Sequence, residues 1–231
     1  MIRLVCLDMA GTTVEDSGTV LAAFDAALSD AGFDAGSAEY AAGRRYAVET
    51  MGQSKIEVFR AILGGDEARA QQANSAFEAA YAESIDAVRP VPGAAEVIEK
   101  LRSAGRRVVL TTGFSPATRD RILDVLGWRE LVPLALSPVD AGRGRPYPDM
   151  VLTALLRTGT TSVQEVATVG DTTSDLLSGH RAGCAVIAGV LTGAHTASDF
   201  ATVPHTHVLD SVADLPEALE RQDLTVTGAR S

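Results

Sequence analysis

The segment Ile2-Arg3-Leu4-Val5-Cys6-Leu7-Asp8-Met9-Ala10-Gly11-Thr12-Thr13 decides the fold of this chain. Its apolar first half, Ile2–Leu7, predicts a buried β-strand, and the glycine that follows predicts a turn. Asp8 stands where this strand ends, a position that suits an exposed nucleophile. Two residues later, Ala10 offers only a methyl group where a second carboxylate would protonate an ester leaving group. If Asp8 is catalytic, its leaving group must therefore depart without that acid.

Composition and charge limit the class of protein. The 231 residues, 46% of them hydrophobic, are enough for a full core and allow one large domain or a domain with an insert. A net charge of −10 argues against a nucleic-acid or anionic-membrane surface. Cys6 and Cys184 both lie in apolar runs and are interpreted as packed free thiols. Without a signal-peptide pattern or an apolar run of membrane-spanning length, we expect a cytoplasmic protein.

Short β-branched runs alternate with helical patterns, which predicts an α/β fold with a doubly wound, Rossmann-like parallel sheet. The stretch from about Leu21 to Ser84 lacks a convincing strand and has apolar residues at helical spacing. We therefore predict a core domain, residues 1–15 and 88–231, an inserted helical cap domain, residues 16–87, and a frayed tail from Arg221. The predicted strands are Ile2–Leu7, Arg107–Thr112, Val132–Leu136, Val166–Gly170, Ala185–Val190 and His207–Leu209.

Four separated segments place polar residues at the sheet edge where such folds bind ligands. Thr112 and Gly113 offer a hydroxyl and an amide for phosphoryl oxygens, and Arg145 is a cation held between a glycine and a proline. Each segment alone is explained as a turn or a helix cap, but their joint order indicates chemistry. The segments are Asp8–Thr12, Val108–Gly113, Gly144–Pro148 and Val169–Asp175.

Carboxylates at two of these strand ends suggest a metal site. Asp8 and Asp171 would share a hard divalent cation with oxygen ligands, Mg²⁺ being the natural choice, which partly neutralises an incoming phosphoryl group. Thr112 and Arg145 would complete a polar cradle around the same point.

This set resembles the haloacid dehalogenase superfamily of aspartate-nucleophile phosphotransferases over nearly the whole chain. The resemblance implies Mg²⁺ as cofactor, an aspartyl-phosphate on Asp8, and the predicted cap as the superfamily's insert. Ala10 in place of a second aspartate, together with Arg145 in place of lysine, resembles the phosphonatase-like branch, whose opening motif is Asp-x-Ala-Gly-Thr. The implied metal ligands are Asp8, Ala10 and Asp171, with Asp175 supporting them, and the implied substrate contacts are Gly11, Thr12, Met51 and Gly113.

A lysine in the predicted cap carries a second hypothesis. Of the 20 basic residues only Lys55 and Lys100 are lysines, and Lys100 lies on an amphipathic helix as a solvated charge. Ser54 and Glu57 have capping-box spacing, which predicts Lys55 as the first residue of a helix, where the partial positive charge lowers its pKa. An exposed first-turn lysine without a function is the alternative.

The segment Met51-Gly52-Gln53-Ser54-Lys55-Ile56 resembles the phosphonatase cap motif Met-Gly-x-x-Lys-Ile. The resemblance implies that Lys55 forms a Schiff base with an aldehyde substrate before Asp8 attacks phosphorus. Electrons would then flow into the iminium, so that no acid is needed at Ala10. The chain departs from that branch at Val58, where the branch has histidine, and at Phe114, where it has tyrosine.

These departures leave the substrate open between phosphonoacetaldehyde and a related 2-oxoalkylphosphonate such as its 1-hydroxy analogue. Two alternatives stand beside this hypothesis: a phosphatase for a small phosphate monoester, such as phosphoglycolate or a sugar phosphate, and a noncatalytic domain that binds a phosphorylated ligand. In each case the partner is a small molecule, not nucleic acid or membrane. Close relatives are often dimers through their caps, and the sequence leaves the oligomeric state and the roles of Arg44, Arg45 and His195 open.

Overall fold

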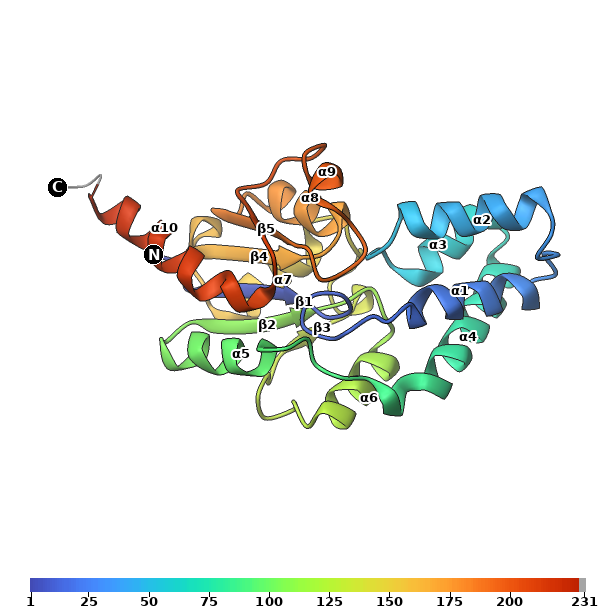
Figure 1. The fold of residues 1–231 in the computed structure, drawn as a ribbon, viewed down its shortest axis with the longest axis horizontal. Coiled ribbons are helices and arrows are strands. Elements are labelled where there is room, and N and C mark those ends of the chain that lie inside the picture. Colours follow the sequence, from blue (N-terminus) through green and yellow to red (C-terminus); the bar gives the residue numbers. More distant parts are fainter. Residues whose placement is uncertain (229–231) are drawn as a thin grey trace.

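The computed structural model describes residues 1–228, with side chains described as far as Asp223. Its strands form one parallel sheet in the order β3-β2-β1-β4-β5-β6, with β1 near the centre (Figure 1). The predicted doubly wound α/β fold is confirmed. The strands are β1 Leu4–Asp8, β2 Arg107–Thr111, β3 Ala135–Leu136, β4 Val166–Gly170, β5 Val186–Val190 and β6 His207–Leu209.

Side chains of β1 alternate between the two faces of the sheet and enter two different cores. Val5 and Leu7 join the larger core, whereas Leu4 and Cys6 join the smaller one. This alternation follows from the two-residue period of a strand, and it lets helices cover both faces. The covering helices are α5 Ala94–Ser103, α6 Pro116–Leu126, α7 Asp149–Thr158, α8 Thr173–Ala182, α9 Ala197–Phe200 and α10 Leu215–Gly228.

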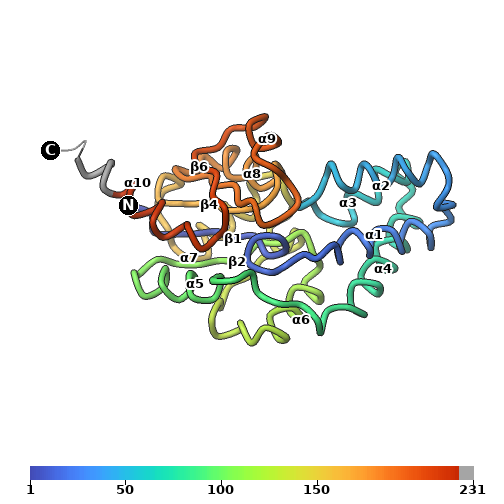
Figure 2. Tube along the Cα trace, in the orientation of Figure 1, coloured from blue at the N-terminus to red at the C-terminus, as the bar shows by residue number. Residues whose placement is uncertain are grey.

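Four helices between β1 and α5, which we call the cap, gather beyond the carboxyl end of the sheet (Figures 1 and 2). Their apolar centre is the cluster of Phe24, Phe59 and Phe77, whose ring centroids lie 4.8 to 6.2 Å apart. Such a cluster gives the helices a core of their own, as offset and edge-to-face rings pack favourably. The helices are α1 Thr19–Asp30, α2 Ala38–Glu49, α3 Lys55–Ile62 and α4 Glu67–Ser84, and 3₁₀ turns follow at η1 Ile85–Ala87 and elsewhere at η2 Pro138–Asp140, η3 Val163–Glu165 and η4 Val212–Asp214.

Two local predictions were wrong. The strand predicted from Val132 is only two residues long, and Pro133, which has no N–H to donate, lies before it. The predicted frayed tail is instead helical as far as Gly228, and residues 229–231 lie outside the described residues. Asp223 anchors this helix, since its carboxylate accepts a hydrogen bond from the amide of Ile2 and pairs with Arg106 at 3.0 Å.

Two further sequence features have structural counterparts. Cys6 and Cys184 are buried free thiols, as predicted. Across residues 1–228, we find no helix with the length and apolar character that crossing a membrane requires.

Candidate active site

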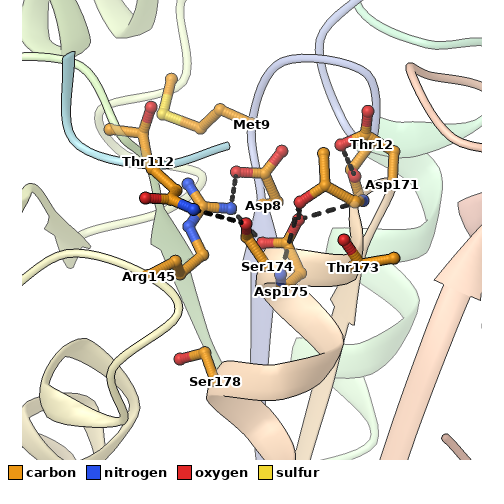
Figure 3. A network of polar contacts seen from close by, with 12 residues as sticks. Asp8, Met9, Thr12, Thr112, Arg145, Asp171, Thr173, Ser174, Asp175 and Ser178 are labelled. Atoms are coloured by element: carbon orange, nitrogen blue, oxygen red, sulfur yellow. Dashed lines mark hydrogen bonds and ion pairs between the residues drawn. The ribbon is translucent and has the colours of Figure 1, made fainter. Parts of the chain in front are cut away.

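The register of the sheet brings the first and second polar segments together. Asp8 pairs with Thr111 across β1 and β2, so that Thr112 follows at the same edge. On the other side of β1, Leu7 pairs with Val169, and Asp171 comes just after β4 ends at Gly170. Figure 3 shows Asp8, Thr112, Arg145 and Asp171 facing one another at this edge. The structure therefore places the predicted polar residues in one site.

The loop after β1 is folded tightly around the backbone carbonyl of Met9, which accepts hydrogen bonds from the amides of Thr12, Thr13 and Val14. Gly11 has a φ of +87°, and a Cβ there would lie 2.4 Å from Oδ2 of Asp171. Glycine is therefore required both by the left-handed backbone and by the close approach of the carboxylate. The loop that follows Asp8 therefore packs directly against Asp171.

Arg145 is the cation of the site. Its Nη1 donates to Oδ1 of Asp8 at 2.5 Å and also to Oδ1 of Asp175 (Figure 3). The side chain is only 4% exposed, and its Nε is buried without a hydrogen-bond partner. Burial raises the pKa of Asp8 to about 6, and the nearby charge of Arg145 opposes this rise. Arg145 thus favours the ionised form of this carboxylate.

A second group of contacts fixes the acidic residues after β4. Asp171 accepts from the amide of Ala194 at 2.7 Å, whereas Oδ2 of Asp175 accepts from the hydroxyl of Thr172 at 2.5 Å. Thr172 and Asp175 also form a capping box at the start of α8. Burial, together with the charges of Asp8 and Asp175, raises the pKa of Asp171 well above its usual value.

The donor set suits a divalent cation. Asp8, Asp171 and Asp175 are all buried, and one oxygen of each lies within 4.8 Å of the others. Three carboxylates at such range repel one another, and Arg145 contacts only two of them. Hard oxygen ligands and an excess of negative charge are what Mg²⁺ requires. The negative charge and the oxygen atoms of these side chains therefore fit Mg²⁺.

Thr112 and Gly113 lie directly after β2, where the sequence predicts phosphoryl contacts. The hydroxyl oxygen of Thr112 accepts from the amide of Phe114 at 3.2 Å, which leaves its hydrogen free to donate. Gly113 is close to the cap, since a Cβ there would lie 2.3 Å from the backbone oxygen of Gln53. The loop after β2 therefore meets both the site and the cap.

Lys55 is the first residue of α3, as predicted, and it is only 6% exposed. Its Nζ lies 5.4 to 5.8 Å from the ring centroids of Phe24, Phe77 and Phe114. Burial lowers its pKa to about 8, with a further contribution from the charge of Arg145. The alternative of an exposed lysine is wrong, and the predicted direction of the pKa change is confirmed, with burial as its main cause.

The predicted capping box at this helix is wrong. Ser54 is the N-cap residue, but its side chain makes no capping hydrogen bond. Glu57 instead pairs with Arg60 at 2.5 Å on the surface of the cap. This salt bridge, one turn along the helix, holds the carboxylate of Glu57 away from the backbone amide of Ser54, with which it would form a capping box.

The cap loop and the sheet edge enclose a cavity of about 20 Å³. An adjoining cleft of about 880 Å³ shares Lys55, Gly113, Phe114 and Arg145 with it. The backbone of Gly113 lies close to Gln53, and Gly52 lies close to Thr172, so that a side chain at either glycine would collide with its neighbour. The cavity is lined by Asp8, Ala10, Asp16, Val20, Met51, Gly52, Lys55, Thr112, Gly113, Phe114, Arg145, Asp171 and Thr172.

One residue that lines the cavity was not predicted from the sequence, and the roles of two other residues had been left open. Asp16 lines the cavity although the sequence analysis gave it no role; a carboxylate eight residues after the predicted nucleophile was the available signal. His195 lies beside the acidic group, with its Nδ1 accepting from the amide of Thr173 at 3.0 Å. Arg44 instead pairs with Asp25 within the cap at 2.9 Å.

Comparison with known proteins places the chain in a family of enzymes. Residues 2–183 match the haloacid dehalogenase-like hydrolase family, and the chain belongs to it. Hydrolases of this family generally use Mg²⁺, and the buried aspartates form a group suited to a metal ion. The function is thus that of a hydrolase of the phosphatase or phosphonatase kind.

Individual relatives narrow the comparison further. The chain is 28% identical to a protein named "Probable phosphatase IndB" from Dickeya dadantii, over 93% of this chain and 92% of that one. It is 27% identical to a phosphonoacetaldehyde hydrolase from Nitratidesulfovibrio vulgaris, over 83% and 72% of the two chains. Its fold matches the crystal structure of a phosphonoacetaldehyde hydrolase-like protein from Oleispira antarctica with a TM-score of 0.78, at 24% identity, covering 95% and 92%.

Proposed function

We propose that this hydrolase cleaves the carbon–phosphorus bond of phosphonoacetaldehyde or a related 2-oxoalkylphosphonate, with Asp8 as nucleophile and Lys55 as imine-forming residue. The observation that carries the proposal is the burial of Lys55 among three aromatic rings, in the same cavity as Asp8. A structural lysine has no need of such a position, because removing an ammonium from water is costly. A lysine that must react as a neutral amine benefits from it.

The reaction begins at the cap. The neutral amine of Lys55 adds to the substrate carbonyl, and loss of water gives a protonated imine. This iminium withdraws electrons from the carbon bonded to phosphorus, so that the carbon leaves as an enamine when Asp8 attacks. The methyl of Ala10 is then sufficient, because the electron pair of the broken bond goes to the iminium nitrogen and no leaving oxygen needs a proton.

The sheet edge holds the phosphoryl group during this attack. Arg145 and the hydroxyl of Thr112 are donors toward its oxygens, and the amide of Gly113 lies beside them. When bound, Mg²⁺ would neutralise phosphoryl charge, held by Asp8, the carbonyl of Ala10 and Asp171, with Asp175 supporting them. Water then hydrolyses the aspartyl-phosphate, and hydrolysis of the imine frees Lys55. In this arrangement residues 16–87 act as the cap domain that carries the lysine.

Reductive trapping tests the proposal. Borohydride added with phosphonoacetaldehyde should attach the substrate carbon skeleton to Lys55, as located by peptide mass spectrometry. Lys55→Arg should abolish both the adduct and phosphate release, whereas Lys100→Arg is the matched control, since that lysine pairs with Glu220 on the surface at 3.5 Å. An unlabelled wild-type protein, with Lys55→Arg fully active, would contradict the proposal.

A second candidate is a phosphatase for a small phosphate monoester. The likeness to the probable phosphatase from Dickeya dadantii, which spans nearly the full length of both chains, favours it. Release of phosphate from phosphoglycolate and sugar phosphates, compared with phosphonoacetaldehyde and its 1-hydroxy analogue, separates the two. Only the phosphatase would retain its activity in Lys55→Arg.

A further inference from the structure

Asp16 lies in the turn that leads from the loop after β1 into helix α1. Its Oδ1 accepts a hydrogen bond from the amide of Val20 at 3.2 Å. Gly18, the N-cap residue of this helix, has no side chain to cap it, so the carboxylate of Asp16 takes that role. The bond fixes the orientation of the carboxylate and uses only one of its two oxygens.

The same carboxylate lines the small cavity between cap and core. Asp16, Lys55, Ala10 and Asp8 are all among the residues that enclose this space of about 20 Å³. The negative charge of Asp16 acts on Lys55 from α3 and on Tyr81 from α4. It opposes the lowering of the Lys55 pKa by burial, and it adds to the rise of the Tyr81 pKa that burial causes. Asp16 is thus an electrostatic neighbour of the lysine.

We propose that Asp16 is the acid–base residue that transfers the proton when the imine on Lys55 forms and when it is hydrolysed. This inference rests on the proposed imine chemistry and adds a catalytic residue to it. The reaction requires such a group, because a hydroxyl leaves a carbinolamine readily only when it departs as water.

The proton balance closes over one turnover. The amine nitrogen of Lys55 bonds to the carbonyl carbon. The carboxylate of Asp16 takes a proton from that nitrogen while the oxygen takes one from solvent, which gives the carbinolamine. Asp16 then passes its proton to the hydroxyl as the carbon–oxygen bond breaks, which yields water, the iminium and the Asp16 carboxylate. After carbon–phosphorus cleavage and protonation of the enamine carbon by solvent, the carboxylate takes a proton from the water that attacks the iminium. It returns this proton to nitrogen as the carbon–nitrogen bond breaks and the hydroxyl loses its proton to solvent, so that Asp16 ends as the carboxylate.

The other ionisable groups that line the cavity are committed elsewhere. Asp8 must be ionised to attack phosphorus, and Arg145 does not release a proton in proteins. Asp171 is held by the amide of Ala194 and belongs to the acidic group suited to a metal. Tyr81 lies nearby, but burial raises its pKa and keeps it protonated. Among the described residues, Asp16 is the carboxylate left to serve Lys55.

Timed borohydride trapping tests this role. Asp16→Asn keeps an oxygen that accepts from the amide of Val20 but cannot supply a proton, so that the helix cap is preserved. The rate at which the substrate labels Lys55 should fall by about a hundredfold. The matched control is Glu15→Gln, which removes the neighbouring exposed carboxylate and should label at the wild-type rate. Asp16→Glu, which restores an acid, should recover part of the loss.

Thermal unfolding checks that the variants are folded. If Asp16→Asn does not fold, Asp16→Ser, which keeps a capping oxygen without a carboxyl group, takes its place. Labelling of either folded variant at the wild-type rate would overturn the role of Asp16 and leave the imine mechanism intact. Absence of any adduct in the wild-type protein would instead overturn the imine mechanism and this inference with it, so the two failures are distinguishable.

Discussion

The amine nitrogen of Lys55 lies 5.4 Å from the centre of the Phe114 ring, although Lys55 belongs to the cap and Phe114 to the loop after β2. The ring face attracts an ammonium ion, but it also helps to exclude water from it. Burial is the main cause of the lowered pKa of Lys55, and the Phe114 ring is part of what buries it. The lowered pKa therefore depends on contact between cap and core.

We predict that imine formation follows the titration of Lys55. With a pKa of about 8, about one lysine in ten is neutral at pH 7. The trapping rate should rise about tenfold per pH unit below pH 8 and level off above it. Phe114→Ser, which admits water, should move this plateau to higher pH, whereas Leu156→Ser on the exposed face of α7 should not. A rate independent of pH between 6 and 8 would contradict this prediction.

The same pKa change should affect stability. Burial disfavours the ammonium form in the folded protein, so Lys55 costs folding free energy below about pH 8, and this cost disappears as pH rises toward the unfolded value of 10.5. We expect Lys55→Met to be more stable than wild type in urea at pH 7, with the difference shrinking above pH 8. Lys100→Met serves as the control and should show no such dependence on pH. If the difference in stability between Lys55→Met and wild type stayed constant across this pH range, changed packing and not the charge of Lys55 would be its cause.

Metal binding should stabilise the fold. At a concentration of Mg²⁺ one hundred times its dissociation constant, linkage adds about 2.7 kcal/mol to the free energy of unfolding, or about 5 to 10 °C in thermal midpoint. Calorimetry with Mg²⁺ and with chelator measures this shift. Asp171→Asn should reduce it strongly, whereas Asp199→Asn, on the exposed start of α9, should leave it unchanged. Equal shifts in both variants would mean that the metal binds elsewhere.

Contact between cap and core at Gly113 should control turnover. In Gly113→Ala the new methyl would lie 2.3 Å from the backbone oxygen of Gln53, so the cap loop would have to move away. A displacement of this order is expected to lower kcat by about a hundredfold while the thermal midpoint changes little. Gly36→Ala is the control, because the nearest atom to its added methyl lies 3.9 Å away. Equal kcat values for the two variants would exclude a role for this contact.

The strand ends were predictable because a parallel sheet brings distant segments to one edge. Asp8, Thr112 and Asp171 each follow a strand that is recognisable from its β-branched residues, so their meeting required only the fold class. Arg145 was predicted as a site residue because it lies between a glycine and a proline and because its segment resembles a known motif. These parts of the site follow from local sequence and topology.

The environment of Lys55 could not be predicted in the same way. Phe24 and Phe77 reach it through packing between α1, α3 and α4, and no local pattern sets how helices cross. Asp16 was missed because no local pattern shows which side of a turn faces the cavity. The capping box failed because Glu57 had a second partner, Arg60, one turn along the helix.

The central place of β1 in the sheet has a consequence for synthesis on the ribosome. This strand is made first, but one neighbour, β2, begins at Arg107 and the other, β4, at Val166. At roughly 5 to 20 residues per second, the strand that carries Asp8 waits about ten to thirty seconds for both neighbours. The four helices made in the interval can bury their phenylalanines in the meantime. Lys55 and two of the three rings around it, Phe24 and Phe77, can thus come together before Asp8 lies in a sheet.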